Sequence, residues 1–213
     1  MILRYYGHAF WTAELENGCV IAFDPYGTFY DFPERSVKAD YCLISHHHHD
    51  HDGLSSLQPG AQVIDTPGVH KLENGVVVRG IATFHDEVQG AKRGPNTFFV
   101  LEAEGMHIGH AGDLGHIPDA GQRSKIGHLD VAMLPVGGYY TIDGAEALDV
   151  CRLLNPTVML PMHYRTKYDE EMPTADLKTF LQLAKAEDQQ MPLLRVVKGD
   201  VHLRPEIVTL RIV

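Results

Sequence analysis

Short runs of alternating or continuous apolar residues recur along the whole chain, separated by Gly, Asn, Asp and Pro. Runs of this length between turn residues predict β-strands. Polar clusters at residues 16–18 and 104–105 predict hairpin turns. The predicted strands are residues 2–6, 20–23, 41–44, 63–65, 76–81, 97–102, 107–110, 131–135, 158–161, 194–197 and 207–213.

Helical patterns lie in the second half of the chain. In residues 144–154 the apolar positions recur at helical spacing, and the pattern stops before an Asn-Pro pair, which disfavours helix. Residues 174–187 have a strong apolar face, with Thr174 as the predicted N-cap. Residues 119–126 fit a shorter helix.

Strands dominate the first half of the chain and alternate with helices later. Two packed sheets flanked by helices satisfy this order, so the predicted fold class is α/β (α+β). No Pro/Ser-rich linker and no repeat of fixed short period interrupts the 213 residues, of which 44% are hydrophobic. We therefore predict one domain over residues 1–213 with a sizeable core.

Charge and cysteine content narrow the function classes. The formal net charge is -10, and an acidic surface repels phosphate backbones, so we expect a small-molecule substrate and no nucleic acid. Cys19, Cys42 and Cys151 form no C-x-x-C pair, which favours reduced cysteines and a cytoplasmic location. We expect neither a signal peptide nor a membrane span, and a homo-oligomer remains open.

Histidine is the unusual residue type, with 14 residues, and it is concentrated in the segment SHHHHDHDG after an apolar strand. His46 and His48 lie two residues apart, so on an extended backbone their side chains point the same way. Asp50 and His51 follow, where the chain is predicted to turn into a helix. One pair can bind one metal ion and the other pair a second, and this donor set suits zinc, iron or manganese.

One loop cannot saturate two metal ions, and three later residues follow strand-like runs where they can complete the set. They are His85 in IATFHDEVQG, Asp113 in HIGHAGDLGH and His163 in VMLPMHY. Taken singly, each is also compatible with an ordinary loop, turn or core residue. Their common placement at strand ends, together with the histidine cluster, favours metal ligation.

The ordered series of these motifs resembles the metallo-β-lactamase superfamily. It is similar in particular to the branch of bacterial ascorbate-6-phosphate lactonase-like hydrolases and N-acyl-phosphatidylethanolamine phospholipase D relatives. The resemblance implies an αββα four-layer sandwich with the site at one edge. The matching stretches, within residues 5–164, are YYGHAFW with IAFDPY, SHHHHDHDG, FHD with RGPNTFFV, HAGDLGH, LPVGGYYTID and PMHY.

The resemblance also implies roles for seven residues and two divalent metal ions, zinc or alternatively manganese or iron. The first ion would be bound by His46, His48 and His85, the second by Asp50, His51 and His163, with Asp113 bridging them. A metal-bridging hydroxide would then cleave a small ester, lactone, amide or phosphoester, since metal ions lower the pKa of water. Asp50 and Asp113 are the predicted catalytic residues, with Asp50 also able to accept a proton from water.

Further residues are candidates for supporting these ligands. Asp24 is expected to orient a ligand histidine, because such histidines usually donate their other N–H to a carboxylate; a plain Asp-Pro turn is the alternative. His8 is expected to face the pocket, with a structural histidine as the alternative. His110 competes with His85 for the ligand role, and we favour His85 because it ends a strand and opens a Gly-rich loop.

Candidates for substrate contact follow the predicted ligands along the chain. They are His116, Tyr140 after a Gly-Gly loop, and Arg165, which is alternatively a solvated cation. Residues 86–96 form a Gly-containing loop that we predict to be a lid, with Arg93 as an anion contact.

Three competing functions are weighed against this hydrolase. A phosphodiesterase or nuclease of the same superfamily is disfavoured by the acidic balance and the lack of a long basic insertion. A flavin-coupled di-iron oxidoreductase would carry a carboxylate where His48 stands. A non-catalytic metal-binding protein stays open as an alternative, although all seven expected ligands are present.

Overall fold

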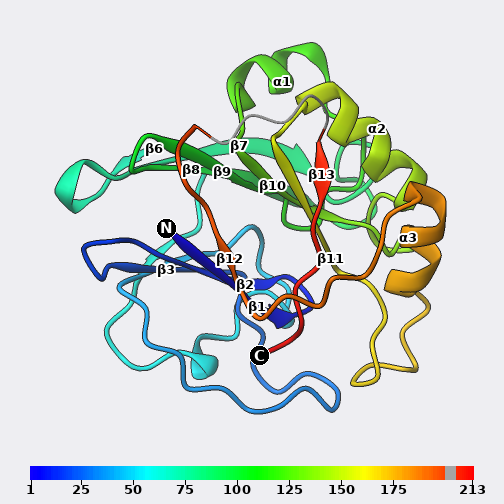
Figure 1. The fold of residues 1–213 in the computed structure, drawn as a ribbon, viewed down its shortest axis with the longest axis horizontal. Coiled ribbons are helices and arrows are strands. Elements are labelled where there is room, and N and C mark those ends of the chain that lie inside the picture. Colours follow the sequence, from blue (N-terminus) through cyan, green and yellow to red (C-terminus); the bar gives the residue numbers. More distant parts are fainter. Residues whose placement is uncertain (200–204) are drawn as a thin grey trace.

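The computed structural model describes residues 1–199 and 205–213 and packs two β-sheets against each other (Figure 1). The six-stranded sheet has the order β12 (Leu194–Arg195), β1 (Ile2–Gly7), β2 (Phe10–Glu14), β3 (Val20–Phe23), β4 (Tyr41–Leu43) and β5 (Gln62–Ile64). The seven-stranded sheet has the order β13 (Glu206–Ile207), β11 (Val158–Met162), β10 (Val131–Pro135), β9 (Met106–His110), β8 (Pro95–Ala103), β7 (Val77–Phe84) and β6 (Gly68–Lys71). These two sheets confirm the predicted mixed α/β fold class.

Three helices, α1 (Ala120–Ile126), α2 (Gly144–Leu154) and α3 (Leu177–Ala184), lie along the seven-stranded sheet (Figure 1). The predicted bounds of α2 are confirmed, and its first turn closes a capping box between Asp143 and Glu146. The helix α3 is shorter than predicted. It begins after Asp176, whose carboxylate accepts the Thr179 N–H, so the predicted cap at Thr174 was wrong.

The core follows from the alternation of side chains along each strand. In β2, Trp11 faces the other sheet, whereas Phe10 faces the opposite side. The inter-sheet core therefore combines apolar residues from both sheets. On the outer face of the six-stranded sheet, connecting loops supply a second apolar cluster, which contains Phe10, Ala22, Tyr26, Phe29, Phe32, Ala39, Cys42, Ile44, Leu57 and Met172.

Several local predictions were wrong in extent or type. The strands β2 and β6 were not predicted, and the strand predicted at 207–213 is reduced to β13 and an isolated bridge at Leu210. No α-helix starts directly after His51, where one was predicted. The chain forms a 3₁₀ turn there, η1 (Leu54–Ser56), and another, η2 (Glu73–Gly75), comes later. Among the described residues, loops rather than α-helices cover the outer face of the six-stranded sheet.

The backbone explains the missing helix after His51. Gly53 donates its N–H to Pro25, and a Cβ at Gly53 would lie 1.9 Å from the Gly27 nitrogen. This contact anchors the loop to a neighbouring loop where a helix would have to continue.

In the described part of the chain, no helix combines the length and apolarity that crossing a membrane requires, and all three cysteines are free.

Candidate metal centre

Four strands deliver the predicted ligands to one edge of the two sheets. β4 ends just before Ser45 and the histidine segment, β7 just before His85, β9 three residues before Asp113, and β11 just before His163. The structure brings all seven predicted ligands together there as two neighbouring groups.

The first group consists of His46, His48 and His85, whose candidate ligand atoms lie within 4.8 Å of one another. His46 and His85 are buried, whereas His48 is exposed. The Oδ2 atom of Asp113 lies 3.1 Å from Nε2 of His85 and 3.9 Å from Nε2 of His46. Three imidazoles and one carboxylate oxygen thus converge, a donor set common at zinc sites.

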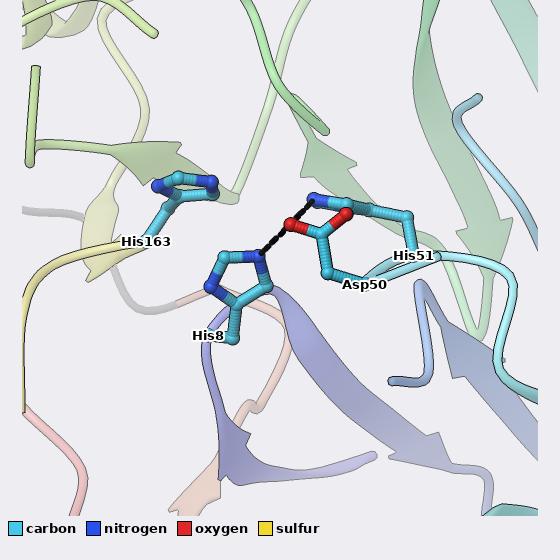
Figure 2. A group of neighbouring side chains, drawn as sticks. All are labelled: His8, Asp50, His51 and His163. Atoms are coloured by element: carbon cyan, nitrogen blue, oxygen red, sulfur yellow. Dashed lines mark hydrogen bonds and ion pairs between the residues drawn. The ribbon is translucent and has the colours of Figure 1, made fainter. Parts of the chain in front are cut away.

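The second group contains Asp50, His51 and His163, with His8 beside them (Figure 2); ligand atoms of these four residues lie within 4.8 Å of one another. Asp113 reaches this group as well. Its Oδ1 lies 3.2 Å from Nε2 of His51, and its Oδ2 lies 3.3 Å from Nε2 of His163. The Asp113 carboxylate therefore contacts both groups, which is the arrangement a bridging ligand needs.

Left-handed backbone conformations fix three residues of the site. The φ angles are +54° at His8, +41° at Asp24 and +51° at His163. Such conformations are unfavourable for residues other than glycine and persist only where the surrounding structure imposes them. Here the His163 N–H donates to the His8 carbonyl at 2.8 Å, so the two histidines hold each other in place.

Asp24 connects the two groups through hydrogen bonds. Its Oδ2 lies 2.9 Å from Nδ1 of His51 and accepts the Ser45 hydroxyl at 2.6 Å. Because that hydroxyl proton is committed to Asp24, the Ser45 oxygen accepts from Nδ1 of His46 at 2.9 Å. Asp24 thereby favours the tautomer in which both His46 and His51 turn an unprotonated Nε2 toward Asp113.

Replacing Asp24 with asparagine is therefore expected to lower metal affinity by about 10–100-fold, because both ligand histidines lose their orienting carboxylate. Isothermal titration of the metal-free protein measures this change. The D40N variant is the control, since Asp40 accepts a backbone N–H in the same sheet away from the cluster. Equal affinity in D24N and the unmodified protein would contradict this role for Asp24.

The buried histidines differ in the direction of their pKa shifts. Burial lowers the pKa of His8 to about 4 and that of His46 to about 3, so both are neutral at pH 7. Burial also acts on His51 and His163, but the Asp113 carboxylate outweighs it and raises the pKa of both. Burial raises the pKa of Asp113, but His163 and His51 outweigh it and hold that pKa well below its usual range.

Metal uptake near neutral pH is expected to release protons, because His51 and His163 must lose theirs to act as ligands. Their pKa values are raised, so affinity should increase as the pH rises through those values and decrease below them. Calorimetric titration in two buffers of different ionisation enthalpy measures the released protons. Uptake with no proton release at pH 6 would contradict this assignment.

The donor atoms fit a divalent cation. Among the described residues, Nε2 of His46 and Oδ1 of Asp113 are buried without a hydrogen-bond partner. Buried polar atoms normally have partners, and bound cations would supply them for both atoms. Neutral imidazoles with carboxylates suit zinc first and also manganese or iron.

The directions of the two imidazole rings distinguish His85 from His110 as the candidate ligand. Nε2 of His110 lies 2.9 Å from the Ala9 carbonyl oxygen, and its ring stacks on Phe23. His110 is thus buried beside the site and turned away from the two groups, whereas His85 faces Asp113.

The candidates for substrate contact lie in different places. Tyr140 lines a cavity of about 460 Å³ that opens over the two groups. Arg165 lines a separate cavity, because the chain turns after His163 and its N–H pairs with Ala175. His116 bonds the Phe84 N–H through its ring and is not among the residues that line the first cavity.

The cavity wall also contains residues that were not predicted from the sequence. Phe29 and Tyr30 come from the loop after β3, and Met172 from the loop after β11. No periodic or chemical pattern distinguishes them from ordinary apolar residues. Only the folding of both loops over the same strand edge makes them neighbours.

Asn96 is another residue that sequence reasoning missed. It is buried in β8, and its side-chain amide donates to Thr83 and to the Ala111 carbonyl, while its Oδ1 accepts the Asp113 N–H at 3.0 Å. This fit requires Gly112, since a Cβ there would lie 2.5 Å from that oxygen and its φ is +54°. Asn96 follows Pro95 and precedes the strand predicted at 97–102, so no sequence pattern distinguished it from a loop residue.

The loop predicted at residues 86–96 ends at residue 94, just before β8 begins, and is organised by one carboxylate. Asp86 accepts the backbone N–H groups of Val88, Gly90, Lys92 and Arg93 at 2.7–2.9 Å. Burial raises its pKa, but these four donors outweigh that effect and bring it to about 2. These bonds fix the internal shape of the loop, and movement of the whole loop as a lid stays a prediction.

Arg93 closes the cavity from this loop. Its guanidinium donates to the Tyr139 carbonyl at 3.0 Å and lies 5.6 Å from the centre of the Tyr140 ring. Both contacts fix the side chain at the cavity wall while leaving further N–H donors available.

Comparisons with known proteins agree with this geometry. The sequence profile of the β-lactamase superfamily domain matches residues 2–163. A UPF0173 metal-dependent hydrolase of Pelotomaculum thermopropionicum is 28% identical over 214 residues, covering 86% of this chain and 93% of the relative. Another of the same name, from Caldivirga maquilingensis, is 31% identical over 191 residues, covering 77% of this chain and 82% of the relative.

A solved structure extends the match to nearly the whole fold. It comes from Thermotoga maritima and carries the designation of a Zn-dependent hydrolase of the metallo-β-lactamase superfamily. The two chains share 34% identity and a TM-score of 0.79, with 99% of this chain and 98% of the other covered.

Proposed function

The chain belongs to the metallo-β-lactamase superfamily and is a metal-dependent hydrolase, and from this premise we propose that it uses two divalent metal ions, zinc first, to cleave a small molecule. The scissile bond is an ester, lactone, amide or phosphoester. One observation carries the dinuclear proposal: the Asp113 carboxylate lies within 3.3 Å of imidazole nitrogens in both ligand groups.

Two bound divalent ions would lower the pKa of a water molecule and polarise the substrate oxygen. The side chains of the two groups are placed to hold these ions. His46, His48 and His85 would hold one ion, and Asp50, His51 and His163 the other. Burial raises the pKa of Asp50, but His51 and His8 outweigh it and keep the pKa below its ordinary value. Asp50 is thus a weak base, which favours its ligand role over proton acceptance.

The cavity supports a small and partly apolar substrate with a negative or strongly polar group. A volume of about 460 Å³ is the size of small-molecule sites. Phe29, Tyr30 and Met172 supply apolar contact, and Arg93 is the only Lys or Arg side chain among the described lining residues. A lactone or ester with a carboxylate or phosphate fits this wall, in keeping with a lactonase-like hydrolase, and a nucleic acid strand does not.

The proposal is tested by reconstitution and a substrate panel. Protein prepared without a tag is stripped of metal, reloaded with zinc or manganese, and assayed on lactones, carboxyl esters and phosphodiesters. About two ions per chain with metal-dependent turnover supports the proposal. One ion per chain would overturn the dinuclear part. Two ions with no turnover across the panel would favour the alternative, a metal-binding protein without catalysis.

Replacing Arg93 with alanine is expected to raise KM for an anionic substrate by about 10–100-fold, the equivalent of one charge-assisted hydrogen bond. A neutral substrate of the same shape should be affected little. The control is K92A, since Lys92 is exposed and pairs with Glu87. Equal effects of R93A on both substrates would show that Arg93 acts on the loop and not on the anion.

A further inference from the structure

His8 lies as close to the second group as its members lie to one another. Its Nε2 is 3.2 Å from Nε2 of His51 and 3.2 Å from Oδ2 of Asp50, and Figure 2 shows its ring directed at both. For comparison, His51 and His163 lie 3.2 and 3.3 Å from the Asp113 oxygens. Ligand atoms around a tetrahedral ion at 2.0–2.1 Å lie about 3.3 Å apart.

The chemistry of these contacts calls for a cation. Nδ1 of His51 lies 2.9 Å from Asp24, so once His51 has given up its second proton, its Nε2 presents a lone pair to His8. Asp50 presents carboxylate oxygens, which are acceptors only. A neutral His8 can donate one N–H to one of these acceptors and cannot satisfy both. A metal ion between the three atoms satisfies all of them.

The backbone leaves His8 little freedom to turn away. The residue is fully buried, its φ is +54°, and its carbonyl accepts from the Tyr5 hydroxyl at 3.0 Å as well as from the His163 N–H. Its ring packs against Phe29 and His163, with centroid distances of 4.6 and 4.1 Å. This position is preorganised for a ligand.

We propose that His8 is a direct ligand of the second metal ion, an assignment that rests on the proposed dinuclear centre. The second ion would then be held by His8, Asp50, His51, His163 and Asp113. The first would be held by His46, His48, His85 and Asp113. The two sites would therefore differ in their number of protein ligands, and the first includes the exposed His48.

The different numbers of protein ligands at the two sites predict two rates of metal loss. The buried, five-ligand ion should leave slowly and the ion beside His48 quickly. Cobalt-loaded protein is mixed with a chelator, and the loss of each ion is followed by its visible absorption. Removing His8 should accelerate the slow phase by at least about 10-fold and alter the absorption of one cobalt, with little effect on the fast phase.

Two variants separate ligation from packing. H8A removes the imidazole, and H8F retains an aromatic ring without a nitrogen donor. Both are expected to show the accelerated slow phase, with circular dichroism confirming that each is folded. H107F is the control, because His107 is a half-buried histidine that lies 3.6 Å from Asp130 and belongs to neither group. If H8F retains the slow phase and the absorption of the unmodified protein, His8 is not a ligand.

The outcome also distinguishes the two proposals. If the unmodified protein binds one ion only, the dinuclear proposal fails, and the assignment of His8 is decided by whether H8F changes the absorption of that ion. If it binds two ions and H8F leaves both unchanged, only the assignment of His8 fails.

Discussion

Replacing Asp113 with asparagine is expected to lower kcat/KM by at least about 10³-fold, because one residue serves both metal sites. Asparagine keeps the size of the side chain but is neutral and offers a single carbonyl oxygen. Asp113 contacts His85, His51 and His163 at 3.1–3.3 Å. The substitution therefore removes the carboxylate that directly contacts histidines of both groups.

Steady-state kinetics together with metal analysis measures this prediction. D113N should bind fewer ions per chain than the unmodified protein, and saturating metal should not restore its activity. D149N is the control, because Asp149 is an exposed carboxylate that pairs with Arg152 on α2. Retention of two ions and of more than about a tenth of the activity would contradict the bridging role.

Removal of the metal ions is expected to lower the melting temperature by about 8–16 °C. An ion present at 1,000 times its Kd stabilises the folded state by about 4 kcal/mol, and each kcal/mol shifts the melting temperature by about 2–4 °C in a domain of this size. The buried cluster should also destabilise the metal-free protein, because without cations the charge of Asp113 is neutralised only by protons on the neighbouring histidines.

Calorimetric scans with and without chelator measure the shift. Returning zinc should restore the melting temperature, and the restored value should rise with zinc concentration as mass action requires. Magnesium, which prefers octahedral oxygen ligands, is the control ion and should restore little. A melting temperature that is unaffected by chelator would mean that the cluster folds equally well without metal.

Local sequence patterns determined most of the secondary structure. The helix α2 was predicted with its bounds because its apolar positions recur at helical spacing and the pattern stops at the Asn-Pro pair after Leu154. The capping carboxylate of Asp143 was found only in the structure. The strand β2 was missed because almost all of its residues are buried, so the alternation of apolar and polar residues is absent. The predicted strand at 207–213 failed because apolar content alone does not ensure partners along a sheet edge.

For the candidate site, too, some features were predicted from the sequence and others were found only in the structure. The seven residues of the two groups follow predicted strands directly or after a short turn, so sequence order and residue chemistry were enough to select them. The distinction between His85 and His110 needed the structure, because both flank strand ends in the sequence. So did the contacts of His8 and Asp24, which come from the first strands of the chain and meet ligands more than 25 residues away.

The sequence by itself determined the fold class, the family resemblance and the identity of the clustered residues, because these depend on local periodicity and on residue types at strand ends. The tertiary structure decided which atoms face one another: Asp113 between the two groups, Asp24 behind His46 and His51, and His8 against Asp50. The physical reason is that ligation and hydrogen bonding depend on distances of about 3 Å. Such distances between residues far apart in the chain arise only when the two sheets pack and the left-handed backbone positions fix the side-chain directions.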